Sequence, residues 1–136
     1  MNGILFAAFL AALLALVNTT TSAAHHSPIH PVLYGGEPDY DACFGTATVG
    51  GLRADGDGFL AVRTGPGVGY PMIDKLINGQ PVSLCWATDD VDWYGVVYTR
   101  EDQDCGTGSS IPLVQAYPGP CLSGWVHRNW LRSFAD

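Results

Sequence analysis

The sequence predicts an all-β domain that is held together by two disulfides and preceded by a signal peptide. From residue 43 onward, short runs rich in Val, Leu, Ile, Thr, Trp and Tyr alternate with clusters of Gly, Pro and Asp, which is typical of strands and turns. Beyond residue 24 the sequence keeps no helical period long enough for an ordinary helix. The cysteine count of 4 is even, as expected for a small exported domain with a disulfide framework.

The first 24 residues have the composition of a secretory signal peptide. They contain no Asp, Glu, Lys, Arg or His, and the apolar run from residue 4 to residue 17 is short for a transmembrane helix. Ser22, Ala23 and Ala24 supply the small residues that signal peptidase requires before its cut. We therefore expect cleavage after Ala24 and a mature protein that is periplasmic or secreted.

The charge balance excludes two classes of partner. The chain carries 13 acidic and 6 basic side chains, a formal net charge of −7, and all of these residues follow the predicted signal peptide. A nucleic-acid binder needs a basic surface, and an anionic membrane repels an acidic chain. We expect no nucleic-acid partner and no stable membrane anchor after cleavage, and we expect a monomer.

The mature chain divides into an arm and one domain. Residues 25–42 hold several prolines and glycines without a usable period, so they are predicted to form an extended N-terminal arm. The domain is expected over residues 43–136. A tight 3₁₀ corner is predicted at Arg128 and Asn129. The predicted strands are Phe44–Leu52, Phe59–Arg63, Met72–Leu76, Pro81–Thr88, Trp93–Thr99, Leu113–Tyr117, Ser123–His127 and a short one over Leu131–Phe134.

Alternation within the strands predicts which side chains are buried. Val82 and Leu84 share one face of their strand, and Ser83 and Cys85 share the other. Cys85 is therefore expected to point away from the interior, where it can reach another segment of the chain.

The cysteines are interpreted as two disulfides. Their spacing lacks the close pairs that a zinc site prefers. Cys105 and Cys121 lie near the two ends of a long excursion over residues 100–122, and pairing them would stabilise the loop by about 3 kcal/mol. The preferred pairs are Cys105–Cys121 and Cys43–Cys85, although the sequence leaves all three connectivities open.

Three segments, in this order, resemble the bacterial Src-homology-3-like (SH3b) domain. Residues 58–76, GFLAVRTGPGVGYPMIDKL, are similar to the family's leading L-x-V-R-x-G-P-x-x-x-Y-P stretch. Residues 78–84, NGQPVSL, are followed by DWYGVV at 92–97. Residues 123–131, SGWVHRNWL, are similar to the closing G-W-V-x-x-x-Y-L. The resemblance covers about residues 47–134.

The resemblance implies a fold and a class of function. The fold would be a small, strongly bent SH3-like β-barrel with a disulfide-stapled inserted loop. The loop counts as an insertion because the family usually has a short hairpin where this chain has residues 100–122. Leu60 and Val62 would point inward, and Trp93 would point away from the side occupied by Tyr94 and Val96. Such modules bind cell-wall peptides or protein segments and have no catalysis of their own.

The resemblance also implies a ligand-binding groove. By position within the motifs, its residues would be Tyr70, Trp93, His127 and Trp130. Aromatic side chains suit this role because they bury a large area with few rotatable bonds. The alternative is that these rings only cover the ends of a small barrel.

The sequence therefore favours a non-catalytic binding module of the bacterial envelope. Its ligand would be a peptidoglycan peptide or an extended segment of a partner protein. The alternative is a secreted inhibitor or stress-related protein that acts through the 100–122 loop. No enzyme is expected, because the sequence has no nucleophile elbow, no H-E-x-x-H and no phosphate-binding loop before a helix.

No cofactor is expected, and one metal site is considered as a minor alternative. The acidic runs 89–92 and 101–104 match no calcium-binding loop and are interpreted as solvated loop tips. Cleavage after Ala24 would place an α-amine beside the imidazole of His25, and His26 and His30 could add nitrogen ligands for Cu²⁺. This would make the protein a periplasmic copper binder.

Overall fold

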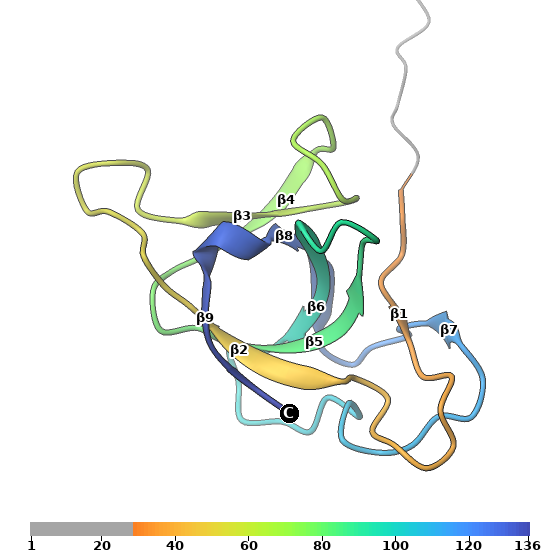
Figure 1. Ribbon diagram of the computed structural model, residues 1–136. Helices are drawn as coiled ribbons and strands as arrows, with labels where there is room; N and C mark the ends of the chain where they lie inside the picture. Colours follow the sequence, from red (N-terminus) through yellow and green to blue (C-terminus); the bar gives the residue numbers. More distant parts are fainter. Residues whose placement is uncertain (1–28) are drawn as a thin grey trace, which may run out of the picture.

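The computed structural model describes residues 29–136, and in this range it confirms an all-β fold (Figure 1). Nine strands and one 3₁₀ turn account for the regular structure of these residues. Among them, no helix has the length and apolar character needed to cross a membrane. The predicted signal peptide and the beginning of the arm, with His25 and His26, lie outside the described residues.

Seven strands form one antiparallel sheet, here called the main sheet. Their order is β4-β3-β8-β6-β5-β2-β9, and Figure 1 shows how the sheet curls around its interior. A 3₁₀ turn, η1 (Arg128–Trp130), connects β8 to β9 and matches the predicted corner. The strands are β2 (Gly45–Val49), β3 (Leu60–Arg63), β4 (Met72–Leu76), β5 (Pro81–Ala87), β6 (Trp93–Tyr98), β8 (Leu122–His127) and β9 (Leu131–Ala135).

The main sheet does not close into the predicted barrel. Within residues 29–136, β4 and β9 are edge strands that do not pair with each other. In β9, a register shift accompanies Ser133, whose φ is 53°, and such a bulge bends an edge strand out of the ladder. Side-chain hydrogen bonds connect segments of the curled sheet instead. The side-chain amide of Asn78 accepts the Leu52 N–H at 3.1 Å and donates to the Leu52 carbonyl at 3.0 Å.

A second bridge holds edge strand β4 to the end of β6. The carboxylate of Asp74 accepts the Tyr98 hydroxyl at 2.6 Å and forms a two-pronged ion pair with Arg100 at 2.9 and 3.0 Å. Arg100 also donates to the Lys75 carbonyl at 2.8 Å, and the Lys75 N–H donates to Asp74. Because these backbone groups are satisfied by side chains, β4 offers fewer free sites for pairing with another chain.

The inner face of the main sheet carries the larger core. The alternation predicted from the sequence is confirmed, since Val82 and Leu84 point inward and Cys85 points to the opposite face. The buried side chains of this core form one cluster: Ala47, Val49, Leu60, Val62, Leu76, Val82, Leu84, Tyr94, Val96, Tyr98, Val126 and Leu131.

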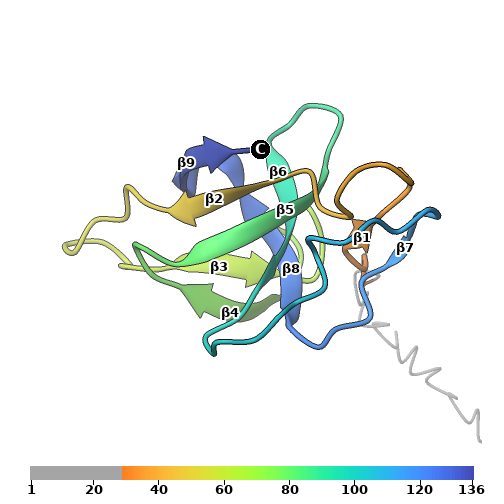
Figure 2. The same cartoon turned by 90° about the horizontal axis from the view of Figure 1, so that it is seen from below.

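The outer face of the main sheet carries a second core that the sequence did not predict. Residues 29–44 and 101–121, here called the outer lobe, pack over β5, β6 and β8 (Figure 2). The arm is therefore not a free extended segment from residue 29 onward. Its β1 (Leu33–Tyr34) pairs with β7 (Gln115–Ala116), and the Trp125 indole donates to the His30 carbonyl at 2.9 Å.

The arm packs on the sheet because its apolar side chains alternate over a stretch too short to be recognised in the sequence. Val32 and Tyr34 point the same way and are 3% and 6% exposed, so a short extended stretch between prolines and glycines presents one apolar face. Its pairing partner lies about eighty residues away within the excursion, and local patterns do not reveal a partner at that separation.

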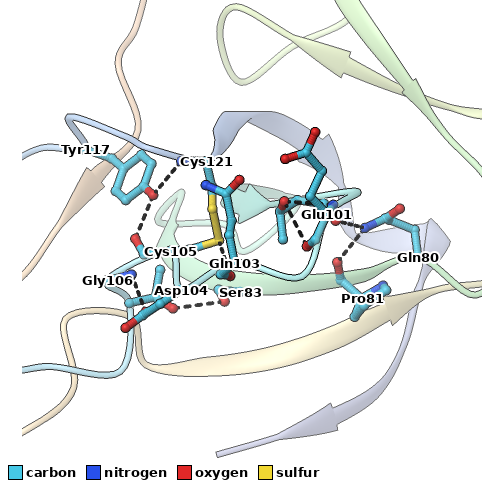
Figure 3. The surroundings of a disulfide bond; sticks show 12 residues. Gln80, Pro81, Ser83, Glu101, Gln103, Asp104, Cys105, Gly106, Tyr117 and Cys121 are labelled. Atoms are coloured by element: carbon cyan, nitrogen blue, oxygen red, sulfur yellow. Dashed lines mark hydrogen bonds between the residues drawn. A yellow bond between two sulfur atoms is a disulfide. The ribbon is translucent and has the colours of Figure 1, made fainter.

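Both disulfides join the pairs that the sequence favours. Cys43–Cys85 fastens the arm to β5, and Cys105–Cys121 closes the base of the excursion. Beside the second disulfide, the Tyr117 hydroxyl donates to the Cys105 carbonyl at 2.6 Å and accepts the Cys121 N–H at 3.1 Å (Figure 3). The predicted strand Leu113–Tyr117 is shorter than expected, because only the two residues of β7 pair with the arm.

Candidate functional site

Three of the four predicted groove residues line one hollow. Trp93, His127 and Trp130 surround a cavity of about 670 Å³ between the turn after β8 and the loop that joins β2 to β3. Phe59, Val68 and Met72 add apolar surface to its wall, and Arg53, Asp57 and Arg63 add charge. This hollow is called the aromatic groove below.

Strand pairing places the first two rings. Trp93 at the start of β6 lies directly opposite His127 at the end of β8, and the rings meet edge to face with centroids 5.1 Å apart. The Asn129 N–H donates to Nδ1 of His127 at 3.1 Å, so His127 caps the 3₁₀ turn. Since Nδ1 accepts this bond, the neutral ring carries its proton on Nε2, where it can donate to a ligand.

The third ring belongs to η1. The Trp130 carbonyl accepts the N–H of Gly50 at 3.0 Å, and the next residue, Leu131, is buried in the inner core at 2% exposure. These contacts fix the backbone, while the indole remains 38% exposed. A large aromatic side chain on an anchored backbone is thus left open to solvent, as in many binding sites.

Tyr70 lies elsewhere and has a different set of contacts. It is not among the described residues that line the aromatic groove. Its ring packs over Gly65, where a Cβ atom would collide with the ring, and it meets His30 edge to face with centroids 5.2 Å apart. Its hydroxyl lies 3.1 Å from Nε2 of His30. Tyr70 therefore connects the turn after β3 to the arm.

Sequence reasoning missed the opposite wall of the groove. Phe59 and Val68 come from the two glycine-rich loops on either side of β3, and Met72 is the first residue of β4. Arg63 is fixed there, because its guanidinium donates to the Tyr70 carbonyl at 2.9 Å. The glycine-rich turn at residues 56–58 is visible in the sequence, but the sequence does not show that Phe59, which follows it, lines the same hollow as Trp130.

Two acidic side chains lie in loops that also contribute residues to the groove or lead into its strands. Asp55 forms an exposed ion pair with Arg53 at 3.0 Å, and this contact lowers the pKa of the carboxyl. Beyond Trp93, the Thr88 hydroxyl and the Asp92 N–H bond the Asp90 carboxylate and lower its pKa. Asp55 and Asp90 are both exposed, and for Asp90 this is consistent with the interpretation of the run 89–92 as a solvated loop tip.

The structure gives no support to a metal or thiol centre in the part of the chain that it describes. No three His, Cys, Asp or Glu side chains converge as metal ligands within residues 29–136. His30 is engaged with Tyr70, and all four cysteines are in disulfides. Comparison with protein-family models, with curated proteins and with solved structures found no match to this chain.

Proposed function

We propose that this protein is an exported, SH3-like binding module of the bacterial envelope that holds an extended peptide in the aromatic groove. The three SH3b-like motifs and the curled antiparallel sheet support the fold. One observation carries the function: Trp93 of β6 meets His127 and Trp130, from the end of β8 and the turn after it, around one hollow, and Trp130 is still 38% exposed.

The groove offers the chemistry that a cell-wall peptide requires. The indoles of Trp93 and Trp130 provide flat apolar surface at little entropic cost. Nε2 of His127 donates to a peptide carbonyl, while Arg63 and Asp57 provide one charge of each sign. Stem peptides of peptidoglycan carry both carboxylates and amines, so they match this mixed lining.

Co-sedimentation with purified sacculi tests the proposal. The oxidised protein is compared with the double variant Trp93→Ala, Trp130→Ala and with Leu113→Ala, a control whose side chain is 77% exposed away from the groove. We expect the parent and the control to sediment with the sacculi and the double variant to remain in solution, with circular dichroism confirming that it folds. If none of the three proteins sediments, wall binding is overturned. If all three sediment, the wall is bound at a site other than the aromatic groove.

A second candidate function is supported by the tip of the excursion. Leu113 and Val114 are 77% and 49% exposed, yet their loop is held by β7 and by the Cys105–Cys121 disulfide. A rigid loop that presents apolar side chains is suited to entering a cleft of another protein, as a secreted inhibitor does. The substitution Leu113→Asp would abolish inhibition of such a target and leave sacculus binding unchanged.

A further inference from the structure

A second hollow, which the aromatic groove does not explain, lies where the arm meets the main sheet. Its volume is about 820 Å³, and none of the described residues lining it also lines the aromatic groove. The Cys43–Cys85 disulfide and Trp86 line it, together with Tyr40 and Phe44, which are 72% and 53% exposed. This second hollow is called the acidic hollow below.

The acidic hollow has charge of one sign only. Glu37, Asp39, Asp41 and Asp136 line it, and no Lys, Arg or His is found among the described residues that do so. Within residues 29–136, none of these four carboxylates forms an ion pair or a side-chain hydrogen bond. The aromatic groove differs, because Arg53 and Arg63 line it.

The acidic segment is held in place before any ligand arrives. The Gly35 N–H donates to the Ala42 carbonyl at 2.8 Å, and the N–H groups of Ala42 and Cys43 donate to the excursion at 2.9 and 3.2 Å. Phe44 N–H donates to the Leu84 carbonyl at 2.8 Å. Because the backbone around the carboxylates is already ordered, binding there costs less conformational entropy.

The spacing of the carboxylates indicates the size of the ligand. In the described part of the chain, no three acidic side chains are close enough to hold one metal ion. The negative charge is instead spread around a hollow that is also lined by aromatic side chains and a disulfide. Such a surface complements a longer ligand that carries several positive charges and at least one apolar group.

We propose that the acidic hollow binds a cationic, extended segment of a partner protein, with Lys and Arg side chains on the carboxylates and an apolar side chain against the disulfide and Trp86. Guanidinium and ammonium groups form charge-assisted hydrogen bonds with carboxylates, and Tyr40 and Phe44 add cation–π contact. The unpaired charge also accelerates encounter with a basic partner. This site is independent of the aromatic groove, so either can exist without the other.

The test uses two synthetic peptides with the same apolar centre and opposite charge: acetyl-Lys-Arg-Trp-Lys-Arg-amide and acetyl-Glu-Glu-Trp-Glu-Glu-amide. Each is titrated into the oxidised, ¹⁵N-labelled protein at low and moderate salt. We expect only the cationic peptide to bind, with amide shifts concentrated in residues 37–46 and 83–87 and with weaker binding at the higher salt. Equal binding of both peptides, binding of neither, or shifts confined to the aromatic groove would overturn the proposal.

Two charge-matched triple variants separate a site from general attraction. Glu37→Gln, Asp39→Asn, Asp41→Asn is expected to weaken binding of the cationic peptide by about 10-fold or more. The control, Asp89→Asn, Glu101→Gln, Asp102→Asn, removes the same charge from exposed loops outside both hollows and should change affinity much less. Equal losses in the two variants would contradict a localised site. The Trp93→Ala, Trp130→Ala variant should keep full affinity for the cationic peptide. Failure of the groove proposal can therefore be distinguished from failure of the acidic-hollow proposal.

Discussion

The two faces of the main sheet are both buried, but they are buried by different means. The inner face packs on itself as the sheet curls, through side chains that alternate along each strand. The outer face is covered by the outer lobe, which is fixed by two disulfides and the two-residue pairing of β1 with β7. The inner core thus follows from local alternation, while the outer core depends on long-range links.

The largest loss of stability is expected when the disulfide that joins the outer lobe to β5 is removed. Replacing Cys43 and Cys85 by Ala opens a loop with a sequence separation of 42 and should lower the free energy of unfolding by about 4 kcal/mol. The matched change at Cys105 and Cys121, with a separation of 16, should cost about 3 kcal/mol. Urea unfolding measures both. A smaller loss of stability for the Cys43–Cys85 pair than for the Cys105–Cys121 pair would show that the Cys43–Cys85 disulfide does not hold the lobe on the sheet.

Two valines on opposite faces test whether the regions unfold together. Val126 in the inner core and Val97 in the outer core are 0% and 1% exposed. If the lobe and the sheet unfold as one unit, Val126→Ala and Val97→Ala should each lower the free energy of unfolding by about 2 kcal/mol. We expect this equality in urea unfolding. A clearly smaller loss for Val97→Ala, with faster amide exchange confined to residues 29–44 and 101–121, would show that the lobe opens separately.

A smaller, pH-dependent effect is expected at the open edge of the sheet. The Arg100 guanidinium, aided by the Tyr98 hydroxyl and opposed by partial burial, lowers the pKa of Asp74 to about 2. A lowered folded-state pKa stabilises the protein above the ordinary value of 3.8, and this stability is lost as the pH falls toward 2. Because Arg100 is half exposed, Asp74→Asn should cost only about 1 kcal/mol at neutral pH.

The measurement is thermal unfolding of the parent and of Asp74→Asn between neutral pH and the lowest pH at which both still fold. The difference in stability should narrow as the solution becomes more acidic. A constant difference across this range would show that the ionised carboxylate is not the source of the stabilisation.

The smallest effect concerns the contact between the arm and the turn after β3. Tyr70→Phe removes the hydroxyl that bonds His30 and should lower stability by about 0.5–1 kcal/mol, while the edge-to-face packing of the rings remains. Amide exchange of His30 and its neighbours measures the loosening. Sacculus binding should not change, and a loss of it would place Tyr70 in the functional site after all.

Predictability from sequence followed the range of the contacts. The strands, the 3₁₀ corner and the outward direction of Cys85 were predictable because each is set by neighbouring residues. The arm was not, since Val32 and Tyr34 acquire their partner only when residues 115–116 are brought beside them. The position of Tyr70 also escaped prediction, because it depends on His30 of that arm.

The two hollows differ in how much of them the sequence indicated. The resemblance to the SH3b motifs pointed to Trp93, His127 and Trp130, and strand pairing and the 3₁₀ turn bring these three residues to one hollow. The acidic hollow combines residues of the arm, β5 and the C-terminal Asp136, so its acids read as ordinary solvated residues in the sequence. The acids at 37, 39 and 41 are neighbours in the sequence, but the hollow that they line, and the addition of Asp136 to it, exist only when these segments meet.

The four tryptophans allow the most direct test of the central claim, because each reports on a different environment. Trp93 and Trp130 line the aromatic groove, Trp86 lies in the acidic hollow, and the Trp125 indole N–H is bonded to the His30 carbonyl. We would titrate soluble peptidoglycan stem peptides and follow the indole N–H signals by NMR. Peptide binding in the groove predicts shifts of the Trp93 and Trp130 signals with the other two unchanged. Shifts of only Trp86 or Trp125, or no shift at saturating peptide, would contradict it.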